Sequence, residues 1–108
     1  MAQTQHFNSF DEMIQGSPTP ILVDFYATWC GPCRIMAGVL EQVKAQVGDE
    51  LTIVKIDTDK YPEIASRWQI YALPTLVLFK DGKPLDRVEG VMQPGALVSR
   101  LRQAVPAV

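Results

Sequence analysis

An alternation of strand and helix patterns constrains this chain most, because it permits only a few folds. Residues 20–27 form an apolar run with a single charge, as expected of a strand buried on both faces. Apolar side chains then recur at helical spacing over 33–47, and 51–56 follow as a second buried strand. Two strands joined by a helix form a parallel pair with a right-handed crossover. The pattern therefore predicts an α/β core.

Two shorter helices accompany these strands. Ser9-Phe10-Asp11-Glu12 has the spacing of a capping box and Gly16 can close the segment, which predicts a helix before the first strand. Asp59 and Pro62 open another helix after the second strand. Within that helix, Trp68 is expected to pack in or against the core.

The C-terminal third predicts a hairpin and a last helix. Residues 75–80 and 84–89 flank Asp81-Gly82, a dipeptide typical of tight hairpin turns. Pro94 starts a helix whose apolar stripe would cover one face of the sheet. The predicted fold class is α/β, a central mixed β-sheet sandwiched by helices on both faces, in a single domain over residues 1–108.

Charge and hydropathy argue against several kinds of partner. The 108 residues include 12 acidic and 10 basic side chains, a formal net charge of −2, with no basic block. Nucleic acids and anionic membranes bind clustered Lys and Arg, so neither is expected. No segment reaches the roughly 18 apolar residues of a membrane span, and the first residues lack a signal-peptide pattern. We expect a cytoplasmic protein.

The two cysteines, Cys30 and Cys33, lie too close together to be a useful structural crosslink. A bond closing a four-residue loop stabilises a fold by about 2 kcal/mol, against roughly 4.7 kcal/mol for a 100-residue loop. Both lie where the first strand passes into the longest helix, and a helix N-terminus favours a thiolate. A stabilisation of about 1.4 kcal/mol would raise the ionised fraction of a thiol at pH 7 from roughly 3% to about a quarter. We expect Cys30 to be the nucleophile and a more buried Cys33 to be the resolving thiol.

Other uses of a cysteine pair fit the sequence poorly. Zinc normally takes four ligands, and the one histidine, His6, is the only other strong candidate. Covalent haem attachment requires His directly after the second cysteine, where this chain has Arg34. A cysteine protease needs a histidine base, and His6 has no accompanying pattern. We therefore expect no metal and no cofactor beyond a reversible Cys30–Cys33 disulfide.

At this level of detail the sequence resembles the thioredoxin family across essentially its whole length. The matching segments are Ala27-Thr28-Trp29-Cys30-Gly31-Pro32-Cys33, Val23-Asp24-Phe25, Lys55-Ile56-Asp57, Leu73-Pro74-Thr75 and Gly90. The Asp-Lys-Tyr-Pro and Leu-Pro-Thr-Leu-Val-Leu-Phe-Lys-Asp-Gly stretches are similar to photosynthetic thioredoxins of the y type. The resemblance implies the thioredoxin fold and a monomeric protein-disulfide reductase, an electron carrier that acts on disulfide-containing target proteins. A separate thioredoxin reductase, dependent on NADPH or ferredoxin, would regenerate it.

Gly31 and Pro32 bear on the direction of electron transfer. Neither supplies a charge, whereas a His between the cysteines would help stabilise the Cys30 thiolate and make the disulfide more oxidising. The resemblance agrees, because Gly-Pro marks the general reductants of the family. We predict a reductase; the alternative, a binding module that holds a partner in the same groove without turnover, is disfavoured as the sole role by the intact cysteine pair.

Asp24 is the one charge in the first strand. Burial disfavours a carboxylate, so its pKa should be raised. The residues alone allow two roles: proton exchange with Cys33, or a structural ion pair with Lys55 on the neighbouring strand. The resemblance favours proton exchange, through a water, with Lys55 modulating Asp24.

Five further residues are expected to bind the target. Trp29 is either core or, as the resemblance favours, a flank of the exposed sulfur. The frequency of cis bonds, about 5–6% of X-Pro in folded proteins, predicts a trans Pro74. The resemblance instead implies a cis Leu73–Pro74 bond beside the cysteines, with the Leu73 backbone pairing to an extended target peptide. It places Ala72 and Gly90 at the same groove, where the missing side chain of Gly90 lets a target approach.

Three positions depart from the family pattern. Gly38 stands where a proline usually kinks the long helix, so that kink is open to test. Ala72 stands where many relatives have Gly, and Glu89 where a small apolar residue is common. Ala72 and Glu89 border the expected groove, so both bear on target preference.

Overall fold

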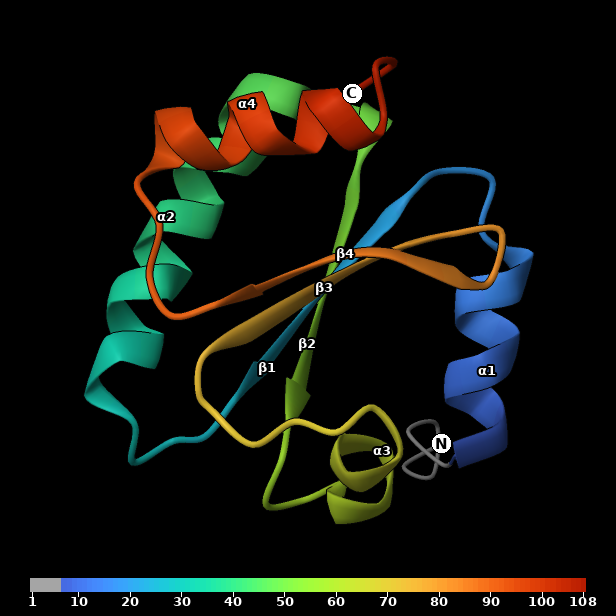
Figure 1. Cartoon of the computed structure of the whole chain (residues 1–108), viewed down its shortest axis with the longest axis vertical. Coiled ribbons are helices and arrows are strands. Elements are labelled where there is room, and N and C mark those ends of the chain that lie inside the picture. The colour runs from blue at the N-terminus through green and yellow to red at the C-terminus, as the bar shows by residue number, and fades with distance from the viewer. Residues whose placement is uncertain (1–6) are drawn as a thin grey trace.

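In the computed structural model, which describes residues 7–108, one four-stranded sheet has the order β2-β1-β3-β4 (Figure 1). The interior strand β1 (Ile21–Tyr26) pairs parallel with β2 (Thr52–Asp57) and antiparallel with β3 (Thr75–Lys80). The fourth strand, β4 (Lys83–Glu89), pairs antiparallel with β3. The predicted mixed sheet is confirmed.

Helices cover both faces of this sheet (Figure 1). One layer consists of α2 (Gly31–Val47) and α4 (Pro94–Ala104), and the opposite layer of α1 (Phe7–Gly16) and α3 (Pro62–Arg67). A short 3₁₀ turn over Gly48–Glu50 connects α2 to β2. Over residues 7–108 no helix combines the length and the apolar character needed to cross a membrane.

Alternation along β1 explains why both layers pack tightly. Leu22 belongs to the core under α2 and α4, whereas Val23 and Phe25 belong to the core beside α1 and α3. Since side chains two apart share a face, Asp24 and Tyr26 lie on the same face of the sheet as Leu22. The strand therefore directs its one carboxylate toward the layer that contains α2.

The predicted hairpin is also confirmed. Asp81 and Gly82 both have positive φ, 54° and 79°, as a tight two-residue turn between right-twisted strands requires. The turn packs closely on α1, because a Cβ built on Gly82 would lie 2.7 Å from Cγ of Gln15.

Three local predictions are wrong in detail. Helix α1 begins at Phe7, so Ser9 lies in its first turn and does not cap it. Strand β2 leaves Thr52 and Lys55 exposed, because it is an edge strand of the sheet formed by residues 7–108. Helix α3 ends one residue before Trp68, which packs edge-on against Phe79 with ring centroids 4.9 Å apart.

Two glycines are predicted to respond oppositely to alanine. Gly82→Ala should lower the free energy of unfolding by about 1–2 kcal/mol, because φ is +79° and the new Cβ meets Gln15. Gly38→Ala should raise it by about 0.5–1 kcal/mol, because Gly38 lies inside α2 with open space around the Cβ position. Urea unfolding followed by circular dichroism measures both changes. Equal effects at the two positions would contradict the requirement for glycine at position 82.

Candidate active site

The cysteines lie at the junction between β1 and α2. The chain turns after β1 through a hydrogen bond from the Cys30 N–H to the Ala27 carbonyl, 3.2 Å long. Cys30 is the N-cap of α2, Pro32 occupies its first turn, and Cys33 follows in that turn. The two cysteines form a disulfide, with an S–S distance of 2.28 Å and Cα atoms 5.3 Å apart. The longest helix thus starts on the reactive pair, as predicted.

The helix N-terminus distinguishes the two sulfurs. The N–H of Cys33 donates to Sγ of Cys30 over 3.2 Å. The first N–H groups of a helix lack intrahelical partners and carry partial positive charge, which favours a thiolate at the sulfur they contact. This supports Cys30 as the nucleophile. The expected contrast in burial is absent in the disulfide form, where Cys30 is 5% and Cys33 4% exposed, because both pack in one cluster with Ala27.

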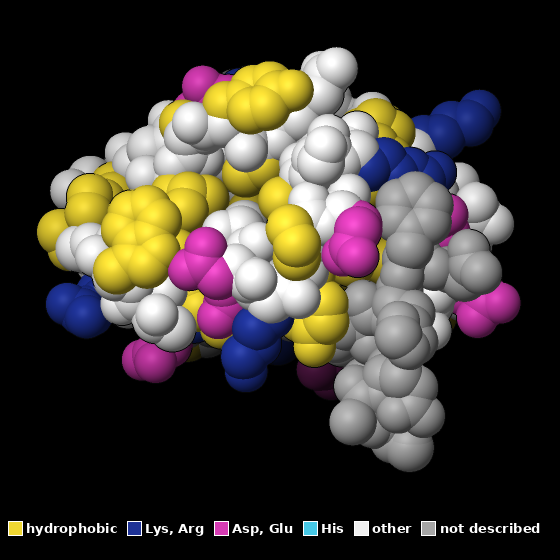
Figure 2. Space-filling view, turned by 90° about the horizontal axis from the view of Figure 1, so that it is seen from below, with side chains coloured by type: hydrophobic (Ala, Val, Ile, Leu, Met, Phe, Trp, Pro, Cys, Tyr) yellow, Lys and Arg dark blue, Asp and Glu magenta, His cyan; other side chains and the backbone are white. Residues whose placement is uncertain are grey.

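A cleft of about 410 Å³ opens beside the disulfide. Figure 2 views the end of the molecule that carries α3 and the β1–α2 junction, where hydrophobic side chains gather at the surface among acidic and basic ones. Trp29 is 68% exposed, so the alternative that it is a core residue is wrong. Its Nε1 donates to the Asp59 carboxylate at 2.9 Å. The residues that line the cleft are Trp29, Cys30, Gly31, Pro32, Thr58, Ile70, Tyr71 and Leu73.

The segment that follows α3 brings the remaining predicted residues together. The Leu73–Pro74 bond is cis, as the resemblance implied and against the statistical expectation. Leu73 lines the cleft and packs on the cysteine cluster. Pro74 accepts a hydrogen bond from the N–H of Gly90, 2.9 Å long, and Gly90 has a φ of +87° with open space where a Cβ would stand. Ala72 is exposed beside Leu73, so Ala72, Pro74 and Gly90 adjoin the cleft without lining it.

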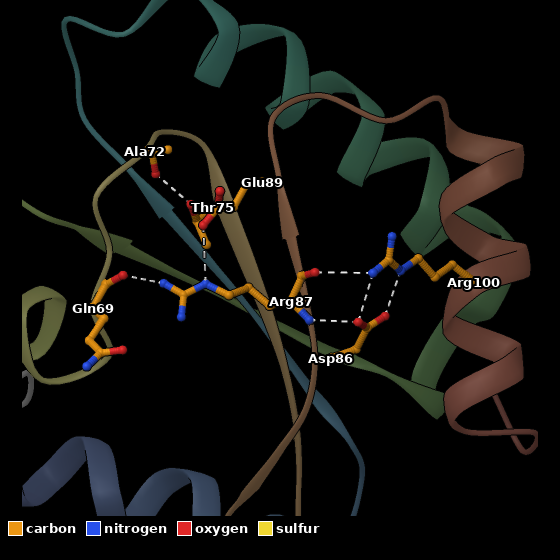
Figure 3. A network of polar contacts seen from close by, with 7 residues as sticks. All are labelled: Gln69, Ala72, Thr75, Asp86, Arg87, Glu89 and Arg100. Atoms are coloured by element: carbon orange, nitrogen blue, oxygen red, sulfur yellow. Dashed lines mark hydrogen bonds and ion pairs between the residues drawn. The ribbon is translucent and has the colours of Figure 1, made fainter.

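A polar network fixes this segment to β4 (Figure 3). Arg87 donates to the carbonyl of Gln69, a residue with a φ of +56°, and forms an ion pair with Glu89 at 3.6 Å. Thr75 Oγ1 donates to the carbonyl of Ala72. Arg87 therefore ties the start of the 69–75 segment to β4, and the Thr75–Ala72 bond closes a turn at the end of the segment.

The same network continues to α4 through Asp86 and Arg100 (Figure 3). Arg100 donates two hydrogen bonds to the Asp86 carboxylate, at 2.7 and 2.9 Å. These bonds hold the pKa of Asp86 below its usual value. Sequence reasoning missed this network, because its members are far apart in the chain. It also missed that Tyr71 lines the cleft. An aromatic residue two positions before Leu73-Pro74 was the feature of the sequence that could have indicated it.

Asp24 is fully buried on the α2 side of the sheet. Its carboxylate oxygens have no hydrogen-bond partner among the described residues, although Lys55 is its direct neighbour on β2. Burial raises the pKa of Asp24 to about 6, and the charge of Lys55 partly opposes this rise. The structural ion pair with Lys55 is not formed, because no carboxylate–ammonium contact joins the two residues. Asp24 can therefore gain and lose a proton near neutral pH.

Within residues 7–108, no group of three or more His, Cys, Asp and Glu side chains is arranged to hold a metal ion. His6, the histidine considered for zinc, lies outside the described residues. The site in the described residues thus contains the disulfide and a cleft with both polar and apolar lining, while the acid Asp24 is buried on the α2 side of the sheet.

A disulfide at the N-terminus of a helix, directly after the central strand of a mixed sheet and next to a cis-proline, defines a thiol–disulfide oxidoreductase. The chain belongs to the thioredoxin family, whose pattern, "Thioredoxin", matches residues 2–103. The predicted thioredoxin fold and protein-disulfide reductase activity are thereby confirmed.

Individual relatives agree with this assignment. A thioredoxin-like protein of Synechocystis sp. is 57% identical over 102 residues, covering 94% of this chain and 97% of the relative. Thioredoxin Y2, chloroplastic, of Arabidopsis thaliana is 52% identical over 104 residues, or 96% of this chain, which spans 62% of that relative's length. The crystal structure of chloroplastic thioredoxin z superposes with a TM-score of 0.82 at 35% identity, covering 91% and 88% of the two chains. The similarity to y-type thioredoxins seen in the sequence is confirmed.

The raised pKa of Asp24 predicts that stability depends on pH. Well below pH 3.8, Asp24 is protonated in both the folded and the unfolded chain. Between pH 3.8 and about pH 6 only the unfolded chain releases the proton, so the free energy of unfolding falls as pH rises, by at most about 3 kcal/mol for this group. Urea unfolding of the oxidised protein and of Asp24→Asn should show a difference that grows from pH 4 to pH 7 in favour of the variant. A difference that is constant with pH would contradict the raised pKa.

Proposed function

We propose that the chain reduces disulfides in target proteins in two exchange steps, with Cys30 as the attacking and Cys33 as the resolving thiol. The observation that carries this assignment is the hydrogen bond from the Cys33 N–H to Sγ of Cys30. It stabilises negative charge on Cys30, so Cys30 is the thiolate available for attack. Its place on the cleft gives a target access to that sulfur.

The electrons balance within the pair. The Cys30 thiolate attacks one sulfur of the target disulfide, a mixed disulfide forms, and the other target sulfur leaves as a thiolate. Cys33 then loses its proton and attacks Sγ of Cys30, which breaks the mixed disulfide and releases the second target sulfur. Two electrons pass to the target, and the Cys30–Cys33 disulfide remains. Gly31 and Pro32 add no charge that would favour the reduced form, which suits a net reductant.

Asp24 is proposed to accept the proton of Cys33 during the second step. Its burial on the α2 side, the absence of a hydrogen-bond partner among residues 7–108 and its pKa of about 6 support this role. A base with a pKa near the working pH accepts a proton most effectively. Lys55 modulates Asp24 through its charge.

The target is proposed to bind as an extended segment across the cleft. Trp29 and Leu73 supply apolar surface in the cleft that Cys30 lines. Ala72 is exposed with a small side chain, and Gly90, which is bonded to the buried Pro74, has open space where a Cβ would stand, so side chains do not block strand-like pairing of a target along this edge. Disulfide-containing proteins are therefore the substrate class.

Regeneration requires a partner, because the active site contains the disulfide alone as its redox group. We propose a separate thioredoxin reductase that uses NADPH or reduced ferredoxin. Adding each purified reductase with its electron source to the oxidised protein and following thiol release distinguishes the two. We further propose that the chain acts as a monomer, as a single domain over 1–108 and in the cytoplasm, since a reducing compartment suits its cysteine usage.

The cysteine roles predict distinct behaviour for two serine variants. In insulin reduction with dithiothreitol as the electron source, Cys30→Ser should lose at least about 100-fold of the wild-type rate, because the attacking sulfur is gone. Cys33→Ser should accumulate mixed disulfides at Cys30, detectable by nonreducing electrophoresis and mass spectrometry. A Cys30→Ser protein as active as wild type would overturn the enzyme assignment, and retained partner binding by it would favour the binding module.

The role of Asp24 predicts a slower second step. In single-turnover reduction of a protein disulfide at pH 7, Asp24→Asn should slow resolution by about tenfold or more while attack by Cys30 is little changed. Asp49→Asn, on the short turn after α2, is a matched control that should behave as wild type. Unchanged turnover of Asp24→Asn across pH 6–8 would contradict the role.

A further inference from the structure

Asp24 and Lys55 are in position to form an ion pair and do not form one. Their Cα atoms are register partners on the parallel strands β1 and β2, and both side chains lie on the α2 side of the sheet. A buried carboxylate opposite an ammonium group normally attracts it. Both oxygens of Asp24 nevertheless lack a hydrogen-bond partner among the described residues.

The ammonium of Lys55 lies over an aromatic ring instead. Its Nζ is 5.7 Å from the ring centroid of Tyr26, within the range of a cation–π contact. Tyr26 follows Asp24 by two residues on β1, so both side chains point to the same face. Lys55 is exposed, and over Tyr26 its ammonium keeps its hydration, whereas reaching Asp24 would bury it.

Within the described residues, Lys55 is the one cation placed to pair with Asp24. The second acid on this face, Asp57, is the register partner of Tyr26, and its Oδ1 accepts the N–H groups of Asp59 and Lys60. On β3 the register partner of Asp24 is the apolar Leu76. Farther along α2, Glu41 and Lys44 line a separate cleft of about 360 Å³ together with Lys55. Among residues 7–108, Lys55 is the charged side chain whose field acts on Asp24.

We propose that Tyr26 is a positioning residue for Asp24: its ring holds the Lys55 ammonium away from the buried carboxyl, which stays unpaired and able to accept a proton. Tyr26 also packs against the cluster of Ala27, Cys30 and Cys33, so its place is fixed by the active site itself. The inference rests on the proposed proton transfer from Cys33 to Asp24 for its functional meaning. The placement of Lys55 can be tested separately from that transfer.

The test measures the Asp24 titration in the oxidised protein, where the cysteines do not titrate, by the ¹³C shift of its carboxyl carbon. Tyr26→Leu removes the ring and should lower the pKa of Asp24 by about one unit or more, as Lys55 moves to the carboxylate. Tyr26→Met is a second ring-free variant, used if Tyr26→Leu does not fold. Tyr26→Phe keeps the ring and should leave the titration unchanged, as should Glu41→Gln, which alters the charge beside Lys55 on α2.

A double variant separates ammonium movement from water entry. In a Lys55→Met background, Tyr26→Leu should no longer lower the pKa of Asp24. Loss of the ring-current shift of the Lys55 ε-methylene protons in Tyr26→Leu, but not in Tyr26→Phe, reports the same movement directly. An unchanged or raised Asp24 pKa in Tyr26→Leu, or an equal fall in the Lys55→Met background, would overturn the proposal.

The pH profile of mixed-disulfide resolution tests whether Asp24 accepts the proton of Cys33. If the Asp24 pKa falls in Tyr26→Leu and the profile shifts to lower pH with it, both the positioning role and the proton transfer are supported. If the pKa falls and the profile stays in place, Tyr26 still positions Lys55, and the role of Asp24 as proton acceptor is overturned.

Discussion

The N–H of Cys33 can reach the sulfur of Cys30 because α2 begins directly after the central strand. β1 is paired on both edges and buried on both faces, so the end of this strand is one of the most fixed points of the fold. A short turn closed by the Cys30–Ala27 hydrogen bond then places Cys30 at the helix cap. The reactivity of one sulfur thus depends on the packing of a strand that contains neither cysteine.

The packing of β1 also explains why the fold tolerates the buried carboxylate of Asp24. An uncompensated carboxylate at Asp24 costs at most about 3 kcal/mol at neutral pH. Full burial of one Leu or Phe contributes about 1.5–3 kcal/mol, so Leu22 and Phe25, both at 1% exposure or less, are together sufficient to offset it. A group with a raised pKa can therefore remain buried in the central strand without loss of the fold.

Features encoded by neighbouring residues were predictable from the sequence, and features made by distant residues were not. The apolar run of β1, the Cys30 and Cys33 spacing and the Asp81-Gly82 turn each carry a local signal that the structure confirms. The cis bond at Pro74 runs against local statistics and was available through family resemblance alone. Nothing local indicates the contact of Lys55 with Tyr26 or of Arg87 with Gln69, because each joins separate elements. Strand β2 was misjudged for a related reason, since an apolar sequence does not reveal an edge position.

The disulfide and the surface beside it come from different halves of the chain. β1 and α2 supply the disulfide and the buried acid, whereas the 69–75 segment and the end of β4 supply the surface beside it. These halves meet through Leu73, which packs on the cysteine cluster, while Arg87 on β4 donates to Gln69 at the start of the 69–75 segment. Glu89 is exposed and forms an ion pair with Arg87, and none of the hydrogen bonds or ion pairs among residues 7–108 joins it to the cysteines, so a substitution there alters surface charge while the sulfur chemistry is preserved. This separation explains how departures at Ala72 and Glu89 coexist with an unaltered Cys30-Gly31-Pro32-Cys33 centre.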